Sequence, residues 1–451
     1  FAPSITVLNR TPQVPVSADQ VNLTWKASDL NNASGPVDSC GMYYKVGTGG
    51  SWVRVSSQMA PGDSLFRATI PPQADGSIVS YYVTAYAPGS STGSFPDPSV
   101  PHFYVIRNAG LTVYDLQYTP YVNGLSGFAN DTVTVTGIVT ADTSDLKVTS
   151  SGRPRLWMAE GTGEWKGITI YGAAASTGID TLVRGDQIRV RGVVIENFSR
   201  TELKVVSILQ VIGRNVAVPA PATMSISGSG SVSYALSNPP VDGNATFEKW
   251  EGVLVSITGP YLIIRNADNL AGGSGSNFGE FFVGSSKTTS FGLRVDDAGT
   301  NRYYADTSAS YTAKPSDAIL IPRYARIATL SGIVDWSFSF YKLLPRTDAD
   351  FGTITGVERV DDVPSTFALS QNYPNPFNPS TTIRYSLLQS ARVTLKVFNM
   401  LGQEVATLAN GEHPAGTFQV TFDASHLASG VYYYQLRAGD LNAVQRMVYL
   451  K

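Results

Sequence analysis

Apolar and polar residues alternate along most of this chain. Val21, Leu23 and Trp25 alternate with polar residues near its start, and Ile383 and Tyr385 do so near its end. This period of two is typical of strands that bury one face. Further runs contain Phe66, Ala68 and Ile70; Val79, Tyr81, Val83 and Ala85; Val393, Leu395 and Val397; and Phe418, Val420 and Phe422. The pattern predicts an all-β protein.

Short predicted strands follow one another closely over residues 1–108. Pro71-Pro72 and Pro88-Gly89 separate them as turns, which favours a sandwich of about seven strands. We expect Trp25 to be the core aromatic residue of this unit, with ligand stacking as the alternative.

Four segments in the middle of the chain share one pattern, a strand-like run that carries a glycine. They span residues 131–141, 184–196, 250–256 and 325–334. A glycine inside a strand usually marks a bulge or a sharp bend, by which small barrels turn corners. We therefore expect Gly137, Gly192 and Gly332 to occupy bulges or positions with positive φ. The repetition predicts two closed sheets, at residues 109–217 and 218–352.

A proline-rich stretch at residues 371–383 separates the last strands from the rest. Closely spaced prolines fix φ and remove backbone donors, so neither a helix nor a central strand can form there. We expect a linker at residues 353–366 and a small β-sandwich at residues 367–451.

Several motifs in this last unit resemble the type A C-terminal sorting domain of the type IX secretion system. The motifs are Tyr373-Pro-Asn-Pro-Phe-Asn-Pro379, Val397-Phe-Asn-Met-Leu-Gly402, Leu427-Ala-Ser-Gly-Val-Tyr-Tyr433 and the terminal Lys451. The resemblance covers residues 367–451. It implies export across an outer membrane and contact with the type IX machinery. The sorting-signal residues that it indicates are Tyr373, Pro374, Asn375, Pro376, Phe377, Asn378, Pro379, Gly402, Gly430 and Lys451.

The upstream units resemble other extracellular modules. Residues 1–108 resemble fibronectin type III or immunoglobulin-like domains. The segments 133–139, 182–193 and 340–346 resemble extracellular OB-fold repeats. The expected architecture is a multi-domain string of an immunoglobulin-like sandwich, two OB-like barrels and a C-terminal β-sandwich sorting domain.

Composition limits the classes of partner. The chain has 451 residues and a formal net charge of −2, so no strong field would attract nucleic acid or an anionic membrane over a distance. No apolar run reaches the ~20 residues that a membrane helix needs. Cys40 is the only cysteine, which excludes an intramolecular disulfide, and we expect it to be buried. The chain starts at Phe1 and not at Met, which is consistent with a removed signal peptide.

Candidate catalytic groups are few. The three histidines, His102, His413 and His426, have neither metal-ligand spacing nor a nucleophile beside them. Residues 272–276 are rich in glycine but lack the following Lys-Ser/Thr of a phosphate-binding loop. We interpret them as a plain loop and expect no cofactor or bound metal.

Carboxylates offer two weaker candidates. Asp296 and Asp297 suggest calcium, but the spaced acidic ladder of a calcium loop is missing and a hairpin turn is favoured. Glu248, Glu251 and Glu280 suggest a glycosidase pair, although sequence spacing cannot supply the required distance.

Two further motifs admit a binding interpretation. Arg184-Gly185-Asp186 spells an adhesion tripeptide, but it opens a predicted strand and a tight turn explains it better. Aromatic residues beside cations suggest single-strand binding by the first barrel. The residues are Trp157, Trp165 and Tyr171, with Arg153, Arg155 and Lys166. Core packing is favoured over this role, and nucleic acid is not an expected partner.

The sequence therefore predicts a non-catalytic, secreted structural protein at the outer cell surface or outside the cell, able to form a filament or surface layer. The alternative is an adhesion module that recognises carbohydrate or nucleic acid through the barrels. Self-association would join the uncharged N-terminal segment to the apolar last strand, because unpaired strand edges of different copies can pair. The residues proposed for this contact are Phe1, Ile5, Val7, Met447 and Tyr449.

Overall fold

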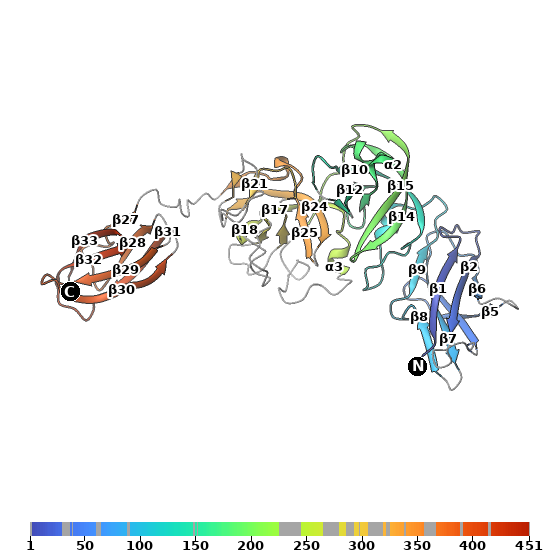
Figure 1. Ribbon diagram of the computed structural model, residues 1–451, viewed down its shortest axis with the longest axis horizontal. Coiled ribbons are helices and arrows are strands. Elements are labelled where there is room, and N and C mark those ends of the chain that lie inside the picture. Colours follow the sequence, from blue (N-terminus) through green and yellow to red (C-terminus); the bar gives the residue numbers. More distant parts are fainter. Residues whose placement is uncertain are drawn as a thin grey trace. The chain divides into compact units, whose positions relative to one another are not determined.

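A computed structural model describes most of the chain. It covers residues 2–28, 37, 39–59, 65–87, 91–147, 149–150, 152–224, 245–264, 279–285, 293–296, 298–304, 319–321, 325–337, 340–355, 367–387, 391–413 and 416–450. The chain forms two compact units, residues 1–356 and 357–451. Strands dominate both units, which confirms the predicted all-β class (Figure 1).

The first unit begins with a sandwich of two sheets, ordered β1-β2-β6-β5 and β4-β3-β7-β8, with β9 also paired to β7. Trp25 is fully buried between them and stacks on Phe66 at 6.1 Å between ring centroids. Cys40 is buried, as predicted. The strands are β1 (Ser4–Thr11), β2 (Val21–Ser28), β3 (Ser39–Val46), β4 (Val53–Ser56), β5 (Gln58–Met59), β6 (Phe66–Ile70), β7 (Ile78–Ala87), β8 (Ser91–Phe95) and β9 (His102–Val105).

A closed barrel follows the sandwich. Its strands pair in the ring β10-β14-β15-β13-β12, and β12 returns to β10. Only β13 and β15 run parallel. A short helix α1 (Val113–Gln117), capped by Thr112, leads into it. The other elements are β10 (Thr132–Ala141), β11 (Thr149–Ser150), β12 (Arg153–Ala159), β13 (Gly167–Tyr171), α2 (Ala174–Thr177), η1 (Ile179–Thr181), β14 (Gln187–Asn197) and β15 (Arg200–Gly213).

A second sheet repeats this order of pairing. β17 pairs with β24, β24 with β25, β25 runs parallel to β20, and β20 continues to β19 and β18. β17 and β18 together take the place of the long β10. The elements are β16 (Ala222–Thr223), α3 (Ala245–Glu248), β17 (Leu254–Thr258), β18 (Tyr261–Ile264), β19 (Phe281–Gly284), β20 (Leu293–Val295), β21 (Tyr303–Tyr304), β22 (Ile319–Leu320), β23 (Arg326–Ile327), β24 (Thr329–Ser337), β25 (Phe340–Leu344), η3 (Asp348–Asp350) and β26 (Ile354–Thr355).

The four glycine-bearing segments correspond to β10 and β14 in the first barrel and to β17 and β24 in the second sheet. The prediction for their glycines was only partly right. None of Gly137, Gly192 and Gly332 has positive φ. Gly192 adjoins a register shift after Arg191, whereas Gly137 and Gly332 pair without one. Close neighbours explain the glycines better, because an added Cβ at Gly332 would lie 2.6 Å from the Leu344 carbonyl oxygen.

The sandwich and the first barrel share one hydrophobic core, whereas the second sheet has its own. One cluster of buried side chains runs from the sandwich into the first barrel, and it contains Trp25, Tyr104, Val133 and Leu156. Arg10 joins the two modules, since it donates to the Gly127 carbonyl and pairs with Asp131. We infer that sandwich and barrel are packed as one body.

The second unit is a separate sandwich with its own core. Its sheets are ordered β27-β28-β31 and β30-β29-β32-β33. Leu395, Tyr385, Tyr434 and Met447 lie among the fully buried side chains between them. The strands are β27 (Ala368–Leu369), β28 (Ser380–Leu387), β29 (Ala391–Phe398), β30 (Glu404–His413), β31 (Gly416–Asp423), β32 (Gly430–Ala438) and β33 (Leu441–Tyr449).

Candidate functional site

The proline-rich loop of the second unit is held by buried polar side chains. Prolines cannot donate a backbone hydrogen bond, so this loop depends on donors from elsewhere. Asn372 is 2% exposed, and its Nδ2 donates to Thr381 Oγ1 at 2.9 Å and to the Pro374 carbonyl at 3.1 Å. Tyr434 Oη accepts the Asn372 backbone N–H at 2.8 Å and donates to the Ser370 carbonyl.

The same loop fixes the last strand. Phe377 is 2% exposed and packs on Tyr449 with 5.2 Å between ring centroids. Its backbone N–H donates to the Val448 carbonyl at 3.0 Å, and its carbonyl accepts from Leu450 N at 3.1 Å. Asn375 Oδ1 accepts from Val448 N at 2.9 Å. Much of the motif therefore serves to hold β33 in place.

The second motif forms the turn between β29 and β30. Asn399 Oδ1 accepts from the backbone N–H groups of Leu401 and Gln403. Gly402 has φ of +78°, a conformation that favours glycine. This geometry turns Met400 and Leu401 outward, and they are 70% and 83% exposed.

These motifs converge on one end of the sandwich. Ala424 N donates to the Pro379 carbonyl at 2.9 Å, which joins the loop before β32 to the proline-rich loop. Gly430 lies opposite Tyr449 in the register of β32 and β33, and its added Cβ would meet open space. Four large hydrophobic side chains at this end are more than half exposed, and we call them the apolar end: Tyr373, Met400, Leu401 and Leu450, at 82%, 70%, 83% and 52%.

Of these four residues, only Tyr373 is among the predicted sorting-signal residues; Met400 and Leu401 lie within a predicted motif, and Leu450 precedes the terminal Lys451. A signal for Met400 and Leu401 was present, since two apolar residues precede Gly402 in a predicted turn. Lys451, the last sorting-signal residue, lies outside the described residues.

In the first unit, a different cluster joins the first barrel to the second sheet that repeats its strand order, and we call it the charged junction. Asp335 on β24 is 1% exposed and accepts from Arg155 Nη2 at 3.2 Å and Arg200 Nη1 at 3.5 Å. Arg200 also donates to the Trp336 carbonyl at 2.7 Å and pairs with Glu202. Apolar side chains seal this contact: Ala141, Leu146, Trp157, Leu254, Ile333 and Leu344.

Residues 371–450 match the family model of a secretion system C-terminal sorting domain. The second unit is a sorting domain. A type IX tail of this kind directs export to the cell surface or the extracellular space, through the type IX secretion machinery. In the described parts of the chain, no helix combines the length and apolarity needed to cross a membrane.

Solved structures with some likeness to the whole chain are remote. A tetra-tandem repeat from the extending region of a large adhesion protein is 12% identical, with 100% of this chain and 99% of that one covered and a TM-score of 0.18. A Salmonella alpha-2-macroglobulin mutant is 9% identical, with 100% and 26% covered and a TM-score of 0.16. Plexin A4 is 9% identical, with 100% and 34% covered and a TM-score of 0.16. Such scores support no conclusion about function. No curated protein matches the sequence.

The glutamates considered for glycoside chemistry are all buried, and the Glu248 and Glu251 carboxylates lie close enough to interact. Glu251 is 1% exposed and accepts from Thr201 N at 2.8 Å, and burial followed by the Glu248 carboxylate raises its pKa well above the usual range. Glu248 accepts from Tyr341 Oη at 2.5 Å. Glu280 pairs with Arg294 and Lys342 on the second sheet. Each of the three carboxylates therefore has at least one hydrogen-bond or ion-pair partner in the fold.

The other charged candidates are also engaged. Asp296 Oδ2 lies 3.3 Å from Lys342 Nζ, and Asp297 lies outside the described residues. Asp186 of the adhesion-like tripeptide is fully buried and pairs with Arg214 at 2.7 Å, while its N–H donates to the Val183 carbonyl. The tripeptide is therefore a tight turn, as predicted. Among the described residues, no group of three or more His, Cys, Asp or Glu side chains is placed to hold a metal ion.

The aromatic candidates of the first barrel pack against other side chains and do not form an exposed stacking surface. Trp157 is fully buried at the charged junction, with the Arg155 guanidinium 4.8 Å from its ring centroid. Tyr171 is 6% exposed, and Trp165 packs edge-on against Tyr118 at 5.6 Å. This confirms core packing for Trp157 and Tyr171.

The residues proposed for self-association have mixed positions. Ile5 is half-buried in β1, opposite Ala27 of β2. Met447 and Tyr449 are buried in the sorting domain. Phe1 lies outside the described residues, as does the side chain of Val7. Contact between copies at these strands remains a prediction.

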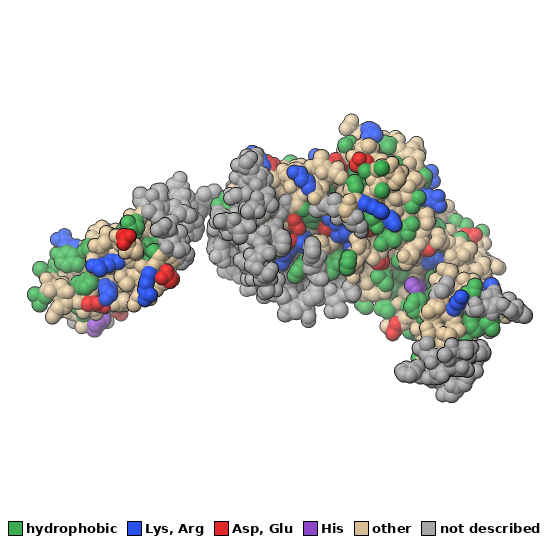
Figure 2. Space-filling model, viewed as in Figure 1, with side chains coloured by type: hydrophobic (Ala, Val, Ile, Leu, Met, Phe, Trp, Pro, Cys, Tyr) green, Lys and Arg blue, Asp and Glu red, His purple; other side chains and the backbone are tan. Residues whose placement is uncertain are grey.

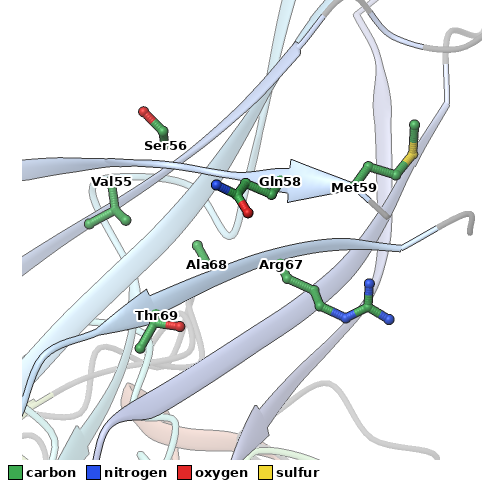
Figure 3. Close-up of a pocket in the computed structure, with 7 residues that line it drawn as sticks. All are labelled: Val55, Ser56, Gln58, Met59, Arg67, Ala68 and Thr69. Atoms are coloured by element: carbon green, nitrogen blue, oxygen red, sulfur yellow. The ribbon is translucent and has the colours of Figure 1, made fainter. Parts of the chain in front are cut away.

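An open depression lies beside β4, β5 and β6 of the sandwich (Figure 3). Arg67 is its only charged lining residue, beside Gln58 and Met59. It contains no acid–base pair or metal-ligand set among these residues, so it offers no chemistry for a reaction.

Proposed function

We propose that this chain is a non-catalytic extracellular structural protein, in which residues 1–356 form a stiff extension exported by the sorting domain. The second, adhesive function considered from the sequence has the barrels as its binding surfaces. The structural role is compatible with barrel faces that are covered by neighbouring modules, whereas the adhesive function needs faces that are open to a ligand.

The observation that carries the proposal is the covered outer face of β12 and β13. The first barrel and the second sheet have the same strand order, and α2 lies between β13 and β14 of the first barrel. Both features support an OB-like assignment. OB folds bind oligonucleotides and oligosaccharides across strands 2 and 3. In this chain the corresponding face carries Arg155, Trp157 and Thr169, which are all buried, and Arg155 is engaged by Asp335 of the second sheet. A face that stacks modules is not free for ligand.

Further contacts support stiffness. Gln117 Nε2 donates to the Gly167 carbonyl at 2.8 Å and to the Glu251 carbonyl at 3.0 Å, so α1 touches both barrel regions. Lys147 N donates to the Ala298 carbonyl at 3.0 Å, and Arg346 Nη1 donates to the Thr140 carbonyl at 2.9 Å. Links at several points of one junction oppose hinge motion.

The test measures the distance between spin labels at Thr181→Cys and Thr258→Cys, both exposed, with buried Cys40 replaced by Ala. A narrow distance distribution is expected, and Asp335→Lys should broaden it. A broad distribution in the otherwise wild-type protein would contradict a stiff extension, and adhesion would become the better proposal.

Self-assembly is the finer part of the proposal. β1 and β33 each lie at the edge of a sheet, and the part of such an edge that is left unpaired can pair with another chain. On β33 this part excludes Val448 and Leu450, whose backbone groups bond to the proline-rich loop. Since Met447 and Tyr449 are buried, the exposed Val444 and Leu450 would supply the apolar contacts of β33. Sedimentation should show concentration-dependent polymers that disappear when residues 1–8 are removed. Monomers at high concentration for both proteins would exclude this mode of assembly.

A further inference from the structure

The hairpin of β14 and β15 carries a row of exposed aliphatic side chains. Beyond Lys204, β15 pairs with β14 alone, because the pairing with β13 ends there. The register then shifts three times, and each shift leaves one residue of β15 without an opposite partner. Those residues are Val206, Leu209 and Ile212, which are 51%, 50% and 45% exposed, and we call them the aliphatic row.

Exposed cations accompany this row. Arg191 lies opposite Ser207 and Arg189 opposite Gln210, both on β14, while Lys204 precedes the row on β15. None of these three cations forms an ion pair with a residue that the structure describes. In Figure 2, basic and hydrophobic side chains lie side by side over the region that Figure 1 assigns to these strands.

The geometry disfavours two common partners. Repeated bulges twist a strand and interrupt its ladder, which natural proteins use to prevent another strand from adding to an edge. Single-stranded nucleic acid needs aromatic platforms, and residues 204–213 contain none. Phe198, which is 93% exposed, lies at the other end of the hairpin.

We propose that the aliphatic row and its three cations dock the first barrel on the anionic surface of a lipid layer. Aliphatic side chains would enter the boundary between headgroups and acyl chains. Guanidinium groups bind phosphate in a bidentate manner. Because the three cations form no ion pair with a described carboxylate, no such pair has to break when they bind a phosphate. Charge complementarity thus selects an anionic over a neutral surface. The proposal goes beyond the structural role and depends only on export to a place where lipid surfaces are within reach.

The experiment is co-sedimentation of the full chain with vesicles of phosphatidylglycerol and phosphatidylcholine, compared with phosphatidylcholine alone. The wild type should bind the mixed vesicles at low salt and release them as salt rises. Arg189→Gln with Arg191→Gln should weaken binding about 25-fold, from roughly fivefold per cation. Val206→Ser with Leu209→Ser and Ile212→Ser should weaken it at least about tenfold.

Matched controls replace exposed residues elsewhere in the first unit. Lys26→Gln with Lys147→Gln controls for charge, and Val122→Ser with Leu125→Ser controls for apolar area. Both should bind as the wild type does, and thermal unfolding should confirm that every variant folds. Equal binding to neutral vesicles, no binding at low salt, or unchanged binding by the row variant would overturn the proposal. So would a wild-type dimer that the row variant converts to monomer, since the face would then join copies of this chain.

Discussion

At the scale of residues, buried arginines join the modules of the first unit. Arg10 connects the sandwich to the first barrel, and Arg155 and Arg200 connect that barrel to Asp335. A buried ion pair adds little net stability by itself, because desolvation offsets the attraction. Removing one partner is different, since it leaves an uncompensated charge in the interior.

Asp335→Ala should therefore destabilise the first unit by roughly 3–5 kcal/mol, because the buried Arg155 guanidinium loses its paired carboxylate and Arg200 keeps only Glu202. All six tryptophans lie before residue 357, so tryptophan fluorescence in urea reports this unit selectively. The control is Glu164→Ala, which removes a partly exposed pair with Lys249 and should cost less than about 1 kcal/mol. Equal effects of the two changes would contradict a central role for the charged junction.

Glu251 should make stability depend on pH. Burial, then the Glu248 carboxylate, raises its pKa, so the folded protein keeps a proton that the unfolded chain releases. Stability should fall as pH rises above the ordinary glutamate range, by up to about 1.4 kcal/mol per pH unit. Glu251→Gln retains an acceptor for Thr201 N and should flatten this slope at pH values above the ordinary glutamate range. Identical slopes in urea titrations of the two proteins would show that Glu251 does not titrate in this window.

At the scale of elements, close packing decides where strands need glycine. An added Cβ at Gly192 would lie 2.7 Å from the Lys204 carbonyl oxygen, and at Gly332 it would lie 2.6 Å from that of Leu344. Alanine at either position should cost about 1–3 kcal/mol through overpacking. Gly49→Ala meets open space and should change the unfolding free energy by less than about 0.5 kcal/mol. Neutral effects at Gly192 and Gly332 would mean that the strands shift apart without strain.

In the sorting domain, some motif residues are buried and stabilise the fold, and others are exposed on the surface. Phe377→Ala should destabilise it by roughly 3–5 kcal/mol, because Phe377 is buried against Tyr449. Met400→Ser with Leu401→Ser should leave its unfolding unchanged and still reduce export, if the apolar end contacts the secretion machinery. Cell fractionation and circular dichroism of the isolated domain measure the two effects. Normal export of the Met400/Leu401 variant would remove the apolar end from recognition.

At the scale of the whole molecule, the two units have separate cores. Deleting residues 367–451 should therefore leave the first unit folded but retained in the periplasm. Tryptophan fluorescence of the retained protein checks its folding, and fractionation checks its location. Normal amounts of the truncated protein in the medium would show that export does not need the sorting domain.

The sequence by itself determined the all-β class, the separate C-terminal sandwich and the sorting motifs, because strand alternation and proline spacing are local properties. It also indicated that the segments that form β10, β14, β17 and β24 share one repeated pattern, a strand-like run with a glycine. Only the tertiary structure decided that Met447 and Tyr449 are buried, that Trp157 faces another module, and that Arg155 and Arg200 meet Asp335 across more than a hundred residues. Such contacts depend on how sheets stack, and no local pattern encodes that. The positions of Gly192 and Gly332 illustrate the same reason, since the backbone that excludes a side chain there belongs to a neighbouring strand.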